Sequence, residues 1–183
     1  NTQSSDLSRE TSSNIKNTYD KWIISSLNST IENVRNSLAD YRFDLASSYL
    51  YEFIWTDYCD WYLEFSKTIL WDDSIHIEEK NLTSATLITV LEAILRLLHP
   101  FMPFITEEIW QNLSIQTKEA KTIMLQKYPK TSDWGKDLES EIEIKWLQKI
   151  ISAIRVLRSE MNVNPGQQIA ILIRESKAKE KKC

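Results

Sequence analysis

The sequence predicts an all-α fold: an antiparallel helical bundle followed by the start of a small C-terminal α/β appendage. The chain has 183 residues but only two glycines, Gly135 and Gly166. Average usage would give about thirteen, and tight turns, bulges and phosphate-binding loops depend on glycine. Apolar residues also recur at spacings of three and four over long stretches, as on one face of a helix. These observations favour long helices over a β-sandwich or a nucleotide-binding fold.

Two long helices are predicted in the first half of the chain. Residues 18–40 carry apolar side chains at helical spacing, and residues 43–70 contain neither glycine nor proline. A short link at residues 41–42 joins them. The apolar side chains of 43–70 are too dense for one narrow stripe, so we expect this helix to be buried on more than one side.

The following segments are shorter. A polar loop is expected at 72–82, and Thr83 or Ser84 can cap a third helix. That helix ends or kinks before Pro100, which lacks an N–H and disfavours helical geometry in the residue before it. Thr106 can cap a short fourth helix that runs to about residue 113.

The C-terminal part of the bundle is expected to be irregular at 114–136, with a brief extended stretch at 123–125. A fifth helix covers 138–161 and ends before the turn signal Asn-Pro-Gly at 164–166. Residues 169–173 form an apolar run that predicts a single strand, which needs a partner from outside this chain.

Three regions follow from this pattern. Residues 1–17 are a polar leader, residues 18–161 are the helical bundle, and residues 162–183 begin a truncated α/β subdomain with a basic tail. We therefore expect the chain to be an excised piece of a longer protein.

The charge is unevenly distributed although the net charge is only −4. Residues 43–73 carry seven acidic side chains and one lysine, whereas residues 145–183 carry nine basic and three acidic side chains. Such blocks are typical of solvated helix faces, and the basic segment is also compatible with a surface for phosphate.

Several classes of function are disfavoured. The two distant glycines cannot form a dinucleotide or P-loop motif. Asp57, Asp60 and Glu64 share one helix face, but neither histidine follows a glutamate by three residues, so no metal site is expected. With no run of 18 apolar residues, no membrane partner is expected either. The two cysteines do not make a disulfide framework, which favours a reducing, cytoplasmic location. Composition and spacing alone leave a helical binding or scaffold module.

Four ordered sequence blocks identify a family. Residues 41–67 contain F-D-x-A, L-Y-E-F-x-W and C-D-W-Y-L-E, and the other blocks are DKWIISSLN at 20–28, TVLEAILRLLHPFMPFITEEIWQ at 89–111 and RSEMNVNPG at 158–166. Together they resemble the anticodon-binding helical domain of the valyl-tRNA synthetases, which are class I aminoacyl-tRNA synthetases. The resemblance covers residues 20 to about 174. The related isoleucyl and leucyl enzymes share H-P-x-x-P-F-x-x-E, and C-D-W-Y-L-E points to valine.

The resemblance implies a parent enzyme, a valine–tRNA ligase, that attaches valine to its tRNA with ATP during protein synthesis. The H-I-G-H and K-M-S-K-S type signatures of that chemistry are absent here, so no catalytic residue, metal or cofactor is assigned to this chain. Its expected partners are the anticodon stem-loop of the valine tRNA and the catalytic domain of the same polypeptide. Two alternatives remain open: a scaffold that does not read the anticodon, and the same domain of an isoleucyl-type synthetase.

The C-D-W-Y-L-E segment is the part that the resemblance implies to face the anticodon. Trp61 and Leu63 would supply apolar surface, and Glu64 would accept a hydrogen bond from a base amino group. Trp61 is equally compatible with a place in the core.

The remaining tRNA-binding candidates lie outside this segment. Arg42 and Phe43 lie at the turn between two helices and suit phosphate contact and helix packing, respectively. Lys67, Arg155 and Arg158 are candidates for phosphate contact, and a structural role is as compatible with each. The acidic block around these residues suits discrimination between bases more than affinity, because carboxylates repel phosphates.

Overall fold

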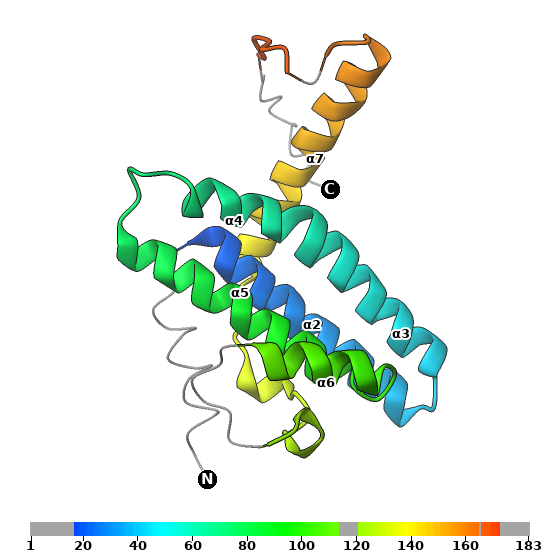
Figure 1. The fold of residues 1–183 in the computed structure, drawn as a ribbon. Coiled ribbons are helices and arrows are strands. Elements are labelled where there is room, and N and C mark those ends of the chain that lie inside the picture. Colours follow the sequence, from blue (N-terminus) through cyan, green and yellow to red (C-terminus); the bar gives the residue numbers. More distant parts are fainter. Residues whose placement is uncertain (1–16, 114–120, 165, 173–183) are drawn as a thin grey trace, which may run out of the picture. The chain divides into compact units, whose positions relative to one another are not determined.

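A computed structural model describes residues 17–113, 121–164 and 166–172, and these residues form helices joined by short irregular segments (Figure 1). The elements are α2 (Thr18–Ala39), α3 (Phe43–Glu52), η1 (Phe53–Tyr62), α4 (Leu63–Leu70), α5 (Ile77–Leu98), α6 (Pro103–Asn112), η2 (Ile123–Leu125), η3 (Thr131–Asp133) and α7 (Leu138–Glu160). The all-α prediction is confirmed for the described residues. The chain divides into two compact units, residues 1–145 and 146–183.

Helix α2 packs against several other elements of the first unit. Asn17 caps it by accepting a hydrogen bond from the Tyr19 amide at 2.9 Å. Its predicted apolar stripe is buried and includes Ile23, Leu27 and Ile31, all fully buried. The helix contacts α3, η1 and α5, so its narrow stripe forms the centre of the bundle core.

Elements α3, η1 and α4 form one continuous rod, as predicted for residues 43–70, but its middle is π-helical (Figure 1). Buried positions follow helical spacing up to Phe53, and the next buried residue, Tyr58, comes five positions later. A π-helix bonds residue i to i+5, and such segments occur mostly as single turns, often at functional sites. The wider turn brings the Tyr58 ring into the core, where its hydroxyl donates to the Leu87 carbonyl at 3.1 Å.

The expectation that this rod is buried on more than one side is wrong. The four large side chains Leu45, Tyr49, Tyr51 and Trp55 are between 36% and 66% exposed. The rod therefore buries one face against α2 and α5 and presents aromatic side chains on another.

A buried carboxylate joins three elements of the first unit. The Tyr62 hydroxyl donates to Oδ1 of Asp20 at 2.6 Å, and the Thr83 hydroxyl donates to Oδ2 at 2.9 Å. Asp20 is only 1% exposed. Burial raises the pKa of its carboxyl above the ordinary 3.8, and the two hydrogen bonds oppose this shift only in part. This contact, called the Asp20 clamp below, fixes α2, η1 and α5 in one register.

Helix α5 begins at Ile77, inside the predicted loop at 72–82 and six residues before Thr83, the first of the two alternative caps. Glu78 and Glu79 in its first turn are favourable next to the positive end of the helix dipole, and Thr83 bonds Asp20 instead of capping. By length and mean hydropathy (1.4), α5 could cross a membrane. Its buried residues, which include Val90, Ala93 and Leu97, pack inside the bundle.

One predicted cap and one predicted extended stretch after α5 are wrong. Helix α6 begins at Pro103, which suits a first turn because its missing N–H has no helical partner there. Thr106 is therefore inside α6 and donates back to the Met102 carbonyl at 2.8 Å. Residues 123–125 form a 3₁₀ turn, η2, where an extended stretch was expected.

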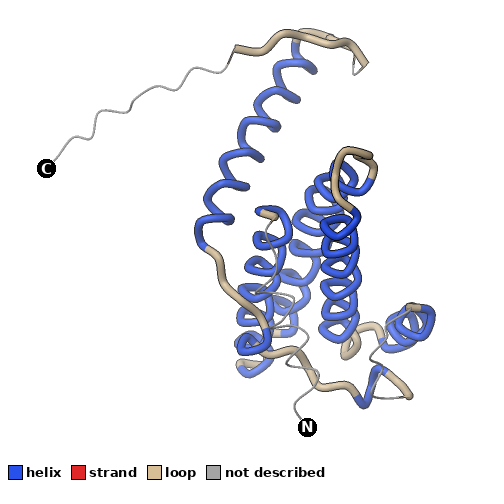
Figure 2. The backbone as a smooth tube through the Cα atoms, turned by 90° about the vertical axis from the view of Figure 1, so that its left-hand side faces the viewer, coloured by secondary structure: helices blue, strands red, loops and turns tan. Residues whose placement is uncertain are grey.

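Helix α7 matches the predicted fifth helix to within one residue. The predicted strand at 169–173 is not formed: residues 169–172 are irregular, and residue 173 lies outside the described residues (Figure 2). A strand is stable only when its backbone bonds to a neighbour, and the described residues contain no second strand. The predicted leader at 1–17 lies outside the described residues except for Asn17.

Replacing Asp20 with alanine should lower the free energy of unfolding by about 2–4 kcal/mol, because two buried hydroxyls lose their acceptor. Asp20→Asn should cost clearly less, since the amide oxygen still accepts and either hydroxyl can accept from the amide nitrogen. Urea denaturation of both variants measures this. Equal costs for the two substitutions would contradict the clamp.

The Asp20 clamp also predicts a pH dependence. Because the pKa of Asp20 is raised in the folded state, the native protein binds a proton that the unfolded chain does not as pH falls towards 3.8. The free energy of unfolding of the wild type, relative to that of Asp20→Asn, should therefore increase as the pH falls from 7 to 4. Urea denaturation of both proteins across this range measures the difference, because the other carboxyl groups contribute equally to both proteins. A stability difference that becomes smaller as the pH falls would contradict the prediction.

Candidate nucleic-acid interface

The C-D-W-Y-L-E segment spans the junction between η1 and α4. Tyr62 is fully buried and held by the Asp20 clamp. Its neighbours Trp61 and Leu63 are half-buried, and Glu64 is exposed. The clamp therefore fixes the direction in which these three neighbouring side chains leave the helix.

Trp61 lies at the edge of an aromatic cluster. Its ring centroid is 5.7 Å from that of Phe65, and the Phe65 ring stacks on Tyr19 at 4.6 Å. Trp61 thus combines the two environments considered for it, the core and the RNA-facing surface. One side of the ring packs on Phe65, and part of the side chain reaches the surface. A rigid, half-exposed indole is suited to stacking on an unpaired base.

Glu64 and Lys67 form an exposed pair on the same face of α4. The Lys67 ammonium donates to Glu64 Oε1 at 2.6 Å and lies 5.9 Å from the centroid of the Trp71 ring. An exposed ion pair contributes little to stability, so either partner can exchange to a ligand. The pair offers one acceptor for a base and one cation for a phosphate.

Arg42 and Phe43 lie at the opposite end of the rod. The Arg42 guanidinium binds both carboxylate oxygens of Asp44, at 2.9 and 2.8 Å, and this hydrogen bonding lowers the pKa of Asp44 to about 2. The Phe43 ring is 56% exposed, so it packs against the bundle only in part.

The two groups of candidates in the first unit are not brought together. Twenty residues of continuous helix, α3 and η1, separate Arg42 from Leu63, a distance of about 30 Å at 1.5 Å per residue. A single ligand that touches both must extend along most of the rod.

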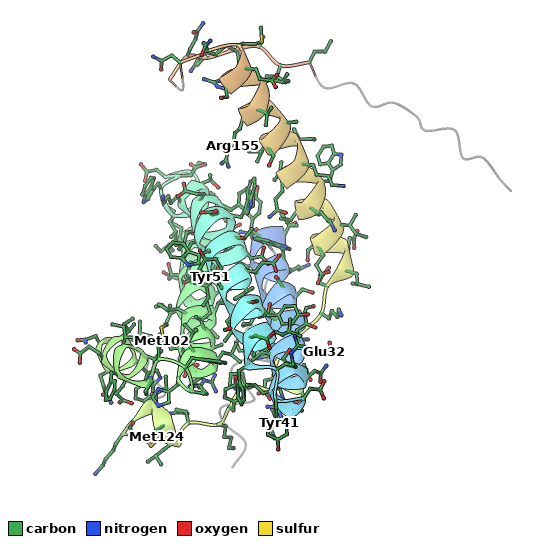
Figure 3. All side chains as sticks on the ribbon, turned by 90° about the vertical axis from the view of Figure 1, so that its right-hand side faces the viewer. Glu32, Tyr41, Tyr51, Met102, Met124 and Arg155 are labelled. Atoms are coloured by element: carbon green, nitrogen blue, oxygen red, sulfur yellow. The ribbon has the colours of Figure 1, made fainter. Side chains whose placement is uncertain are left out.

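Arg155 and Arg158 belong to α7 in the second unit. Arg155 is exposed (Figure 3). Arg158 donates through Nη2 to the carbonyls of Asn164 and Gln167, at 2.5 and 3.1 Å. In this structure Arg158 therefore anchors the turn after α7.

The sequence patterns missed one pair of exposed aromatic residues. The ring centroids of Tyr51 and Trp55 are 6.2 Å apart, and the side chains are 66% and 56% exposed. Both belong to the L-Y-E-F-x-W block, whose apolar density suggested burial. Their four-residue separation beside exposed Glu52 and Thr56 was the available signal that they share an outer face.

Metal binding and a nucleophilic cysteine find little support in the part of the chain that the structure describes. No group of three or more His, Cys, Asp or Glu side chains is placed there to hold a metal ion. Asp57, one of the three carboxylates weighed for such a site, accepts a hydrogen bond from Ser26. Burial raises the pKa of the Cys59 thiol, which is the opposite of an activated nucleophile.

Comparison with known proteins gives the family. The family model described as the anticodon-binding domain of tRNA ligase matches residues 20–173. This chain belongs to that family. It is 42% identical over 183 residues to the valine–tRNA ligase of Coxiella burnetii (strain RSA 493 / Nine Mile phase I), a match that covers all of this chain and 20% of that protein.

Two further relatives are the valine–tRNA ligases of Legionella pneumophila strains Lens and Paris. Each is 48% identical over 156 residues, which covers 85% of this chain and 17% of the relative. The chain therefore spans about a fifth of the length of these relatives and corresponds to their anticodon-binding part.

Arg42→Ala should raise the pKa of Asp44 from about 2 towards its ordinary 3.8, because hydrogen bonding to the guanidinium is the largest cause of the shift. NMR titration of the Asp44 carboxyl carbon measures this directly. Lys67→Ala serves as the control and should leave the Asp44 titration unchanged. An unaltered Asp44 pKa in Arg42→Ala would show that the pair is not formed in solution.

Proposed function

We propose that this chain is the anticodon-binding part of a valine–tRNA ligase and that it reads unpaired anticodon bases of the valine tRNA. The observation that carries the proposal is the C-D-W-Y-L-E segment, in which the buried Tyr62 orients Trp61, Leu63 and Glu64 at the surface. The identity of the relatives as valine–tRNA ligases favours valine over isoleucine.

The chemistry of this segment suits an unpaired base. Bases in single-stranded loops are splayed out, stacked on aromatic side chains and bonded on their edges. Trp61 and Leu63 supply apolar surface, and the Glu64 carboxylate accepts from an exocyclic amino group. A base that presents a carbonyl at the same point would face the carboxylate without a proton to share, which gives discrimination.

Affinity comes from the basic side chains, including Lys67, the single lysine within the acidic block. Lys67 and Arg42 each have an exposed carboxylate partner that a phosphate can replace. Arg155 lies in a segment with net positive charge and, with Arg158, supplies further phosphate contacts. Phosphate contacts position the RNA without reading its sequence.

The activity of the whole protein follows from its relatives as part of the same proposal. A parent enzyme in the cytoplasm attaches valine to its tRNA with ATP, and both the ATP site and the catalytic residues belong to a part of that protein outside this chain. Residues 18–161 serve as the tRNA-binding bundle, and residues 162–183 begin a further subdomain.

A scaffold role is the second candidate, and one observation favours it. Large apolar side chains of α6, its cap and η2 are 47–90% exposed: Met102, Phe104, Ile105, Met124 and Leu125. An apolar patch of this kind often marks a protein interface. In this alternative the bundle packs on the catalytic part and orients the tRNA without reading it.

Binding to two stem-loops separates the candidates. The chain should bind a valine anticodon stem-loop more tightly than one with altered anticodon bases, as measured by fluorescence anisotropy. Glu64→Gln should reduce this preference by about 1–3 kcal/mol with little change in salt dependence. Arg155→Gln, the matched charge control, should weaken both complexes equally and reduce the salt slope by about 1. Equal affinity of the wild type for both stem-loops would leave the scaffold role.

A further inference from the structure

Tyr41 occupies a backbone conformation that usually requires glycine. Its φ is 57°, in the left-handed region where a side chain is strained. The Arg42 amide donates to the Ser37 carbonyl at 2.8 Å, and the Tyr41 amide donates to the Leu38 carbonyl at 3.1 Å. These two bonds define a Schellman motif that ends α2, with Tyr41 at the position where glycine, or sometimes asparagine, is usual.

Helix α7 ends with the same motif, but there an asparagine occupies the left-handed position. The Val163 amide donates to the Arg158 carbonyl at 2.9 Å, and the Asn162 amide donates to the Ser159 carbonyl at 3.2 Å. The left-handed residue there is Asn162, with φ 50°. An asparagine therefore suffices for the motif, and a tyrosine is not needed to end the helix.

Packing does not compensate for the strain at Tyr41. Its side chain is 81% exposed and lies at the tip of the turn between α2 and α3 (Figure 3). Strained residues that the fold retains are concentrated at functional sites. An aromatic ring held in solvent by a rigid turn points to a ligand.

The surroundings of Tyr41 favour a small planar group over a protein surface. The next two residues are Arg42, whose guanidinium is oriented by Asp44, and Phe43, which is 56% exposed. The other exposed side chains near the tip are mostly polar (Asn36, Asp40, Asp44, Ser47 and Ser48), with Ala39 and Leu45 the apolar ones. Two rings beside a guanidinium in a polar setting match a stacked nucleobase and its phosphate, whereas the core of a protein interface is depleted of charge.

We propose that Tyr41 is a second tRNA contact, on which an unpaired nucleotide of the bound tRNA stacks while Arg42 exchanges from Asp44 to its phosphate. This inference rests on the proposed function. The contact lies about 30 Å along the rod from Glu64, so it binds a part of the tRNA other than the base that Glu64 reads. The chain would then hold the RNA at two separated points.

Two substitutions at Tyr41 separate stacking from structure. Tyr41→Asn removes the ring and places a residue that tolerates the left-handed region, so its unfolding temperature should equal or exceed that of the wild type. Its affinity for a full-length valine tRNA transcript should fall about 5-fold or more, the range expected for loss of one stacked base. Tyr41→Phe keeps the ring and should stay within about 2-fold of the wild type.

Fluorescence anisotropy and thermal unfolding of the three proteins decide the outcome. Wild-type affinity in Tyr41→Asn would overturn the inference, leave the anticodon proposal standing and assign the ring to a protein contact. A lower unfolding temperature in Tyr41→Asn would also overturn it, because the ring would then be structural. A wild type that binds no tRNA would refute the proposed function itself, and this inference with it.

Discussion

The first unit depends on one buried carboxylate. Asp20 accepts hydrogen bonds from Tyr62 of η1 and Thr83 of α5, so a single side chain of α2 sets the register of three elements. Burying a carboxylate is costly unless it is well bonded, and its raised pKa shows that the bonds offset only part of that cost. Polar contacts of this kind specify one arrangement among several apolar packings, and here the specified arrangement includes the direction of the residues beside Tyr62.

The π-helical segment makes the Asp20 clamp possible and determines what the rod presents. The five-residue step from Phe53 to Tyr58 brings Tyr58 and then Tyr62 into the core. Trp55, within this step, stays exposed on the outer face beside Tyr51 of α3. The acidic and aromatic surface is therefore a consequence of how the core is packed, and it suits selection among bases better than attraction of a phosphate backbone.

Helical periodicity predicted α2 and α7 closely because the apolar residues of each recur at spacings of three and four. Periodicity alone could not locate the π-helical segment. Over residues 53–62, an α-helix and a π-helix differ only in whether one buried residue lies four or five positions after the last. Thr83 and Thr106 were predicted as caps from residue type, but both lie inside helices. Their hydroxyls instead bond Asp20 and His99, which residue type alone does not indicate. The strand at 169–173 was predicted from an apolar run, but an apolar run does not show whether a neighbouring strand is present to bond its backbone. The C-D-W-Y-L-E motif at 59–64 gave the candidate site, whereas the strain at Tyr41 is visible only in the backbone.

The central claim is that the Asp20 clamp presents residues 61–67 to the anticodon. NMR chemical-shift mapping with a valine anticodon stem-loop, and with one altered only in its anticodon bases, tests it most directly. The account predicts that shifts at Trp61, Leu63 and Glu64 differ between the two RNAs, while shifts elsewhere in the first unit are shared. Equal shifts with both RNAs, or none at these three residues, would contradict it.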